Sequence, residues 1–166
     1  MLLSIAPGGA LEVTDAIGSG FPMDASRGRP VVIALGGTGV AAALPLVSRR
    51  VADGDATRTE VLIGLRIRSE VPLQTDLDAW LRAGVRVVLC VSQDEPAAAD
   101  AADPLRYARG YVQDAMRLRA AEHLHSLTGT LVFAVGAESM IDSLRELAPE
   151  LGIRPEDVLT NRERAP

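Results

Sequence analysis

Three short turns carry the residues whose types and spacing suit chemistry. The first, Gly36-Gly37-Thr38-Gly39, follows the apolar run VVIAL and leads straight into a helical pattern. Glycine lets a backbone approach a ligand closely, and the N–H groups at a helix start attract an anion. A turn of this kind is also an ordinary link between a strand and a helix, and GGTG does not satisfy the G-x-G-x-x-G dinucleotide fingerprint. By itself, this turn leaves a ligand cradle and a plain structural turn both open.

Two further turns follow apolar runs in the same way. Residues 136–140 read GAESM and open a helical pattern, whereas residues 64–68 read GLRIR and contain Arg66 and Arg68. The arginines are either part of a site or ordinary solvated charges. In doubly wound sheets, ligands bind beyond the carboxyl ends of the strands. Because all three turns stand at such strand ends, we expect them to surround one crevice, and their combination favours a binding site.

The sequence offers little other reactive chemistry. The single cysteine, Cys90, lies inside the apolar run VRVVLCVS, which indicates a packed thiol and allows no internal disulfide. His123 and His125 are two positions apart on a helical pattern, so they point to different faces and cannot chelate one metal ion. There is neither a G-x-S-x-G elbow nor a Cys–His nucleophile pattern. We therefore predict no catalytic residue and no metal site.

Composition and charge narrow the class of protein. The chain has 166 residues, enough for one domain with its own core, and is 48% hydrophobic and 23% charged. A net charge of −5, with aromatics at 3% and no basic stripe, argues against a nucleic-acid surface. The start shows no signal-peptide pattern. The uncharged run 31–48 is broken by glycines and falls short of the roughly 20 residues of a membrane span. We expect a cytoplasmic protein without a membrane partner.

The elements that must position the three turns alternate along the chain. Continuous apolar runs rich in β-branched residues predict strands that are buried on both faces, as in a parallel sheet. Helical patterns lie between them at 39–54, 73–84, 111–127 and 139–152. The alternation predicts an α/β fold: an open, parallel, five-stranded, Rossmann-like sheet with helices on both faces. Its strands are expected at 31–35, 60–65, 85–91, 130–135 and 157–160.

Two segments do not fit this alternation. Residues 1–29 contain one strand-like piece at 10–14, followed by a connector with Gly18, Gly20 and Pro22. Residues 93–109, QDEPAAADAADPLRYAR, predict an acidic loop rich in alanine and proline. Loops of this length inside a compact domain are usually functional or mobile.

Together these motifs resemble the NAD(P)-binding half of the ferredoxin–NADP reductase superfamily, especially flavin reductase-like and hydrogenase- or dihydroorotate dehydrogenase-associated electron-transfer subunits. The family pattern has G-x-G-I-A-P after the first strand, Y-G-x-R after the second and C-G-x-x-x-M after the fourth. The corresponding segments here are GTGVAA (37–42), IGLR (63–66) and VGAESM (135–140). GYVQD (110–114) resembles a G-x-V-x-D helix start, and LEVTDAIGSGFP (11–22) resembles the closing strand and connector of the family's flavin barrel.

The resemblance implies an architecture and a set of ligand-binding roles. The strand order would be 3-2-1-4-5, with residues 1–29 a remnant of the flavin barrel and its connector, and 30–166 the NAD(P)-binding domain. The first turn would hold the pyrophosphate, the arginines the adenosine ribose or its 2′-phosphate, the third strand's end the adenine half, and the last turn the nicotinamide. In that order, the implied residues are Gly36, Gly37, Thr38, Gly39 and Val40; Arg66 and Arg68; Ser92 and Gln93; and Gly136, Ala137, Glu138 and Met140.

The resemblance also implies cofactors and partners. The arginine at the second strand's end favours NADP over NAD, and a FAD or FMN group is expected on a partner or a missing domain, because the cofactor carries hydride chemistry. Ala42 stands where the family has proline and Val135 where it has cysteine, and the barrel itself is missing. Alone, the chain is expected to bind a dinucleotide without oxidising it.

Three hypotheses follow. The first is the NAD(P)H-binding domain or subunit of a flavin-dependent oxidoreductase, docked on a flavin-bearing body. The second is a degenerate, non-catalytic interaction module of the same fold. The third is a flavodoxin-like or other nucleotide-binding domain, which the strand order 2-1-3-4-5 would favour. Apolar surface where a barrel would pack also predicts self-association into a homo-oligomer.

Overall fold

The computed structural model describes residues 20–93, 106–122 and 127–160, together with residues 6, 8–10, 12, 13 and 15. Its centre is one parallel sheet with the strand order β4-β3-β2-β1-β5-β6. Every neighbouring pair runs parallel, with Val31 beside Thr59 on one side and Leu131 on the other. The strands are β1 (Val31–Gly36), β2 (Thr59–Leu65), β3 (Arg86–Val91), β4 (Arg106–Arg109), β5 (Leu131–Val135) and β6 (Val158–Thr160).

The predicted fold is confirmed. The five expected strands are β1, β2, β3, β5 and β6, and their order in the sheet is the expected 3-2-1-4-5. The flavodoxin-like order 2-1-3-4-5 is not the one observed, so the third hypothesis loses its support.

One strand was missed, because its sequence was interpreted as part of a loop. Residues 106–109, RYAR, form β4 and pair with β3, Val88 lying beside Arg106 and Val91 beside Arg109. An edge strand hydrogen-bonds along one side only and often carries charged side chains. Its two arginines are exposed at the ends of the strand, so no apolar run marks it. The rest of the predicted loop, residues 94–105, lies outside the described residues.

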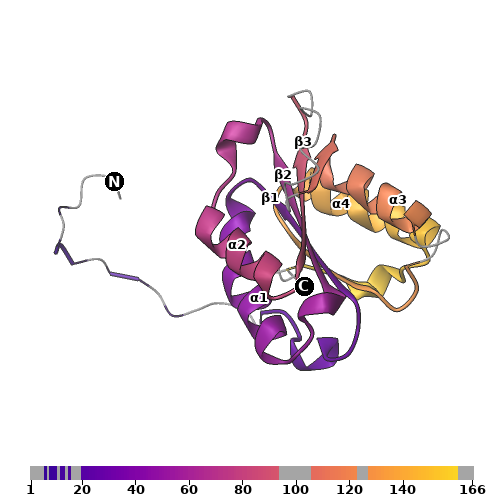
Figure 1. The fold of residues 1–166 in the computed structure, drawn as a ribbon, viewed down its shortest axis with the longest axis horizontal. Coiled ribbons are helices and arrows are strands. Elements are labelled where there is room, and N and C mark those ends of the chain that lie inside the picture. Colours follow the sequence, from indigo (N-terminus) through magenta and orange to yellow (C-terminus); the bar gives the residue numbers. More distant parts are fainter. Residues whose placement is uncertain are drawn as a thin grey trace.

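Helices cover both faces of the sheet, as Figure 1 shows. α1 (Ala43–Ala52) and α2 (Gln74–Arg82) lie on one face, and α3 (Val112–Glu122) and α4 (Glu138–Leu147) on the other. Residues 39–42, predicted as the start of the first helix, belong instead to a 3₁₀ helix, Gly37–Ala42, which precedes α1. Residues 123–126, which include both histidines, lie outside the described residues.

The core has two halves because side chains alternate across the strands. Ile33 and Leu35 face α1 and α2, where they join Leu77 and Trp80. Val32 and Ala34 face α3 and α4 with their neighbours on β2 and β3. These strand residues are at most 1% exposed, which explains the continuous apolar runs in the sequence. Cys90 is buried in the second half, as predicted.

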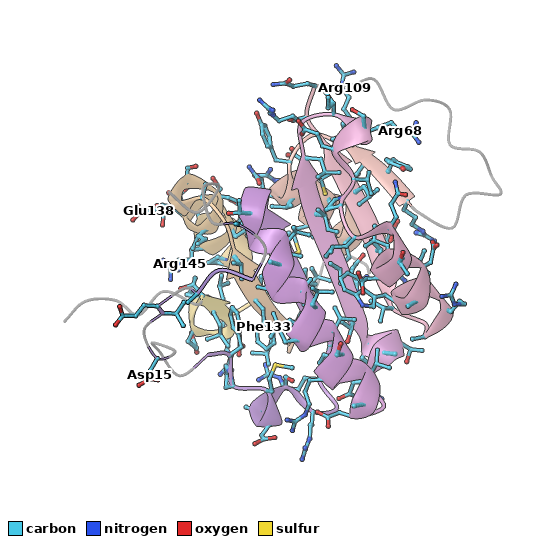
Figure 2. The ribbon with its side chains drawn as sticks, turned by 90° about the vertical axis from the view of Figure 1, so that its left-hand side faces the viewer. Asp15, Arg68, Arg109, Phe133, Glu138 and Arg145 are labelled. Atoms are coloured by element: carbon cyan, nitrogen blue, oxygen red, sulfur yellow. The ribbon has the colours of Figure 1, made fainter. Side chains whose placement is uncertain are left out.

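Residues 21–29 pack on the domain. The ring of Phe21 stacks on Phe133 of β5, with their centroids 4.6 Å apart. In Figure 2, Phe133 lies in the interior of the molecule. Of the strand predicted at 10–14, the described residues Ala10, Glu12 and Val13 are not in a strand. They lie away from the sheet (Figure 1), and a strand needs a neighbour for its backbone hydrogen bonds. The division of the chain at residue 29 stays a prediction.

A buried arginine ties this connector to the base of the sheet. Arg50 of α1 is fully buried, and its guanidinium donates to Thr59 Oγ1 at 3.0 Å, to Asp55 Oδ2 at 3.1 Å and to the carbonyl of Arg29 at 2.8 Å. It also donates to the carbonyl and hydroxyl oxygens of Ser26. A buried charge is tolerated only where it is paired and hydrogen-bonded. Asp55 supplies the opposite charge, and the other acceptors supply hydrogen bonds to the guanidinium.

Candidate functional site

A cleft of about 1350 Å³ opens at the carboxyl ends of the central strands. The three turns predicted to surround one crevice all line it, together with the end of β3 and the start of α3. The predicted site residues that line the cleft are Gly36, Gly37, Thr38, Gly39, Val40, Arg66, Ser92, Gly136, Ala137 and Met140. Arg68, Gln93 and Glu138 are not among the residues that line it. Which of these residues bind a ligand stays a prediction.

The first turn needs two of its glycines for different reasons. Gly37 has a φ of +55°, in the left-handed region that glycine adopts without strain. At Gly39, a Cβ atom would overlap the carbonyl oxygen of Val135 on β5. Gly39 thus lets the turn lie directly against the neighbouring strand. Part of the GGTG pattern is therefore a packing requirement, which also brings the backbone of the turn to the floor of the cleft.

Gly36 and Gly136 face each other at the ends of β1 and β5 and hold a single side chain between them. A Cβ at Gly36 would lie 2.9 Å from Met140 Sδ, and one at Gly136 would lie 2.8 Å from Met140 Cε. A Cβ at Gly136 would also lie 3.1 Å from the Gly36 nitrogen. The two strand ends therefore approach so closely that only glycine leaves room for the half-buried methionine in the first turn of α4.

The two predicted arginines have different surroundings. Arg66 lines the cleft, and its Nη2 lies 3.0 Å from Glu70 Oε1 on another lining residue. This hydrogen bond lowers the pKa of Glu70 below its usual value, so Glu70 is ionised at neutral pH. Arg68 instead stacks on the ring of Tyr107 of β4, 3.8 Å from its centroid. It lies at the carboxyl end of the sheet together with Arg109 (Figure 2), beside the cleft rather than in it.

The end of β3 is held against the end of β2. The Ser92 N–H donates to the carbonyl of Leu65 at 3.1 Å, and the Gln93 N–H donates to the carbonyl of Arg66 at 2.9 Å. These bonds continue the pairing of β2 and β3 beyond the strands and hold the backbone of Ser92 at the edge of the cleft. The Gln93 side chain is exposed, and so is Glu138 in the first turn of α4.

Sequence reasoning missed the contribution of α3. Tyr111, 61% exposed, and Gln113 both line the cleft. The Tyr111 N–H donates to Asp114 Oδ2 at 2.9 Å, which caps α3 and holds this backbone in place. Gln113 Oε1 is buried without a hydrogen-bond partner in the described part of the chain. The GYVQD motif was the available signal, but no residue of it was assigned to the site.

Cys90, the one thiol among the residues that line the cleft, is not an activated nucleophile. Burial, reinforced by the charges of Asp114 and Glu60, raises the pKa of the Cys90 thiol to about 12. A protonated, buried thiol is a poor nucleophile. Within the ranges that the structure describes, no three His, Cys, Asp or Glu side chains are placed to hold a metal ion. The arrangement suits an elongated ligand with an anionic centre: a glycine turn, an unpartnered acceptor and an exposed ring are spread along one cleft.

In open α/β sheets, nucleotides and other ligands bind in a crevice at this carboxyl edge. Residues 33–146, most of the chain, match the family model of the oxidoreductase NAD-binding domain. The chain belongs to this family. No curated protein matches the sequence.

Two solved structures show the same fold. One is the Amycolatopsis cytochrome P450 reductase GcoB, with a TM-score of 0.67 and 21% identity over 85% of this chain. The other is the ferredoxin reductase in carbazole 1,9a-dioxygenase, in its FAD apo form, with a TM-score of 0.51 and 17% identity over 81% of this chain. The matches cover 39% and 35% of those proteins, so this chain corresponds to only a part of each. The expected membership of an oxidoreductase NAD-binding family is confirmed by the family model, and the two reductase structures share the fold of this chain.

The structure also bears on the membrane question. Among the described residues, no helix has both the length and the apolar character to cross a bilayer.

Proposed function

We propose that this domain binds NADH or NADPH in the cleft and orients the nicotinamide ring toward a flavin carried by another domain or a partner subunit. The observation that carries the proposal is the meeting of three strand-end turns in one cleft, in a chain of the oxidoreductase NAD-binding family. The proposed role is binding and orientation, and the buried, protonated thiol of Cys90 is given no part in the chemistry.

The lining of the cleft supports a direction for the dinucleotide. The pyrophosphate would lie over the turn at 37–40, where the backbone is bare of side chains at Gly37 and Gly39. The adenosine half would extend toward Arg66 and Ser92, and Tyr111, just before α3, adds its exposed ring on that side. The nicotinamide would then lie toward the β5 end of the cleft, beside Met140.

A dinucleotide in this direction needs a separate electron acceptor. When bound, the reduced nicotinamide supplies a hydride, which leaves with its electron pair. We expect the acceptor to be FAD or FMN on another body, since the solved structures with this fold are more than twice as long as this chain. The chain's own residues would set the ring position and hold no proton in the transfer.

Arg66 supports NADP, but its surroundings weaken the argument. A 2′-phosphate at Arg66 would compete with the Glu70 carboxylate, which already accepts a hydrogen bond from the guanidinium. The preference for NADP therefore stays a prediction, and a titration with both dinucleotides decides it.

Calorimetric titration of the purified chain with NADH, NADPH, FAD and FMN tests the proposal. We expect one or both dinucleotides to bind and neither flavin to bind. Arg66→Gln should weaken binding of the preferred dinucleotide at least fivefold. The matched control is Arg82→Gln, at the exposed end of α2, which should leave binding unchanged. If neither dinucleotide binds at millimolar concentration, the proposal is wrong.

That negative result would favour the second candidate, a non-catalytic interaction module. Its support is the pair of departures from the family pattern, Ala42 and Val135, both of which line the cleft. A partner recovered without flavin, by a chain that binds no dinucleotide, would support this candidate. Self-association stays a separate prediction, which sedimentation equilibrium of the chain tests.

A further inference from the structure

Met140 is the one methionine among the described residues that lines the cleft, and it is half-buried there. Its thioether fills the space between the ends of β1 and β5 that Gly36 and Gly136 leave open. The space is tight, since even one added carbon at Gly36 would come within 2.9 Å of the sulfur. A change of size or polarity at this sulfur therefore acts directly on the turns that follow β1 and β5, both of which line the cleft.

The other described methionines have different surroundings. Met116 is 2% exposed in the core under α3. Met23 is half-buried in the connector and belongs to the core half on the opposite face of the sheet. Oxidation of methionine requires access of the oxidant to sulfur and replaces a flexible apolar group with a polar one. Of the three, only Met140 combines access from the cleft with a position between two glycine turns.

We propose that Met140 is an oxidation site that controls dinucleotide binding. A peroxide, such as hydrogen peroxide, transfers one oxygen atom to the thioether sulfur. The sulfur is oxidised by two electrons to the sulfoxide, the O–O bond breaks and water leaves. The added oxygen enlarges the side chain packed between Gly36 and Gly136 and makes it polar, so we expect the two turns to shift. The consequence for binding rests on the proposed function.

Peroxide treatment of the full chain, followed by peptide mass spectrometry and calorimetry, tests the inference. We expect Met140 to oxidise at least tenfold faster than Met116, and saturating NAD⁺ or NADP⁺ to slow that oxidation at least fivefold. The oxidised protein should bind the dinucleotide at least tenfold more weakly while it keeps its native circular dichroism spectrum. Methionine sulfoxide reductases should restore the affinity.

Two variants separate Met140 from general damage. Met23→Leu should remain peroxide-sensitive, since Met23 lies away from the cleft. Met140→Leu, compared with its own untreated affinity, should change less than twofold on treatment.

Met140 oxidising no faster than Met116 would overturn the inference, as would oxidation without loss of affinity or with global unfolding. If the untreated chain binds no dinucleotide, the proposed function fails first; if untreated protein binds and oxidised protein binds equally well, only this inference fails.

Discussion

Gly39 shows how a single residue serves both the fold and the site. Its missing Cβ lets the first turn lie against Val135, and the same contact sets the floor of the cleft. Gly129, by contrast, has a φ of +81° and open space where a Cβ would lie. Gly39 is therefore needed for the close contact with β5, whereas Gly129 is needed only for its left-handed backbone.

We predict that Gly39→Ala weakens dinucleotide binding more than tenfold. Overpacking against the Val135 backbone should also lower the free energy of unfolding by about 1–3 kcal/mol. The control, Gly129→Ala, should cost about 1–2 kcal/mol through its left-handed backbone, with binding unchanged. Urea denaturation and calorimetry measure both quantities. Equal losses of affinity in the two variants would contradict a specific role for Gly39.

Cys90 makes the stability of the domain depend on alkaline pH. Burial raises the pKa of its thiol to about 12, so the folded chain keeps a proton that the unfolded chain releases above about pH 9. The contribution of this thiol to the free energy of unfolding is fully present below about pH 9 and is lost as the pH rises toward 12. We expect a loss of about 2 kcal/mol between pH 8 and 10.5. Urea denaturation of Cys90→Ala should lack this contribution; an identical pH profile in both proteins would show that another group titrates.

At the scale of elements, α1 is joined to the connector and to the start of β2 through Arg50. The guanidinium serves acceptors from three segments, and Asp55 has its own carboxylate buried beside it. Such a network holds the base of the sheet, at the opposite end of the strands from the cleft.

We expect Arg50→Met to lower the free energy of unfolding by about 3–5 kcal/mol, because it leaves the Asp55 carboxylate buried and unpaired. The double variant Arg50→Met/Asp55→Asn should recover part of that loss. The exposed Arg27, whose salt bridges with Asp24 and Asp53 lie at the surface, provides the control: Arg27→Gln should cost at most about 1 kcal/mol. Urea denaturation gives all three values. A double variant less stable than Arg50→Met would show that the unpaired Asp55 carboxylate is not the cause of the loss.

At the scale of the whole molecule, the connector packs on the domain from Phe21 onward. Phe21 and Met23 pack against the core half that contains Phe133, and the backbone N–H of Gly28 donates to Asp55 Oδ2 at 2.9 Å. The connector is thus held by stacking and by hydrogen bonds along its length. These contacts fix where residues 21–29 lie on the surface of the domain.

Truncation locates this boundary. Removal of residues 1–20 should change Tm by less than about 2 °C. Removal of 1–29 should lower it by about 10 °C or more, since it removes the Phe21 stack and the Ser26 and Arg29 acceptors of Arg50. Differential scanning calorimetry measures both, and Phe21→Ala should give an intermediate value. Equal Tm values for the two truncations would place the boundary at residue 29.

The sequence by itself determined the α/β fold and its strand order through local pattern and family resemblance. Strands buried on both faces need continuous apolar runs, so β1, β2, β3, β5 and β6 are visible as such. The glycine turns were visible for the same local reason. β4 was not, because an edge strand with exposed arginines needs no apolar run.

Only the tertiary structure decided how the site residues are arranged. Met140 lies between Gly36 and Gly136 because two strands that are distant in sequence end side by side. Arg68 stacks on Tyr107 because β4 joins the sheet next to β3. The start of α3 lines the cleft for the same reason. These contacts join segments far apart in the chain, and local spacing carries no record of which strand ends will meet.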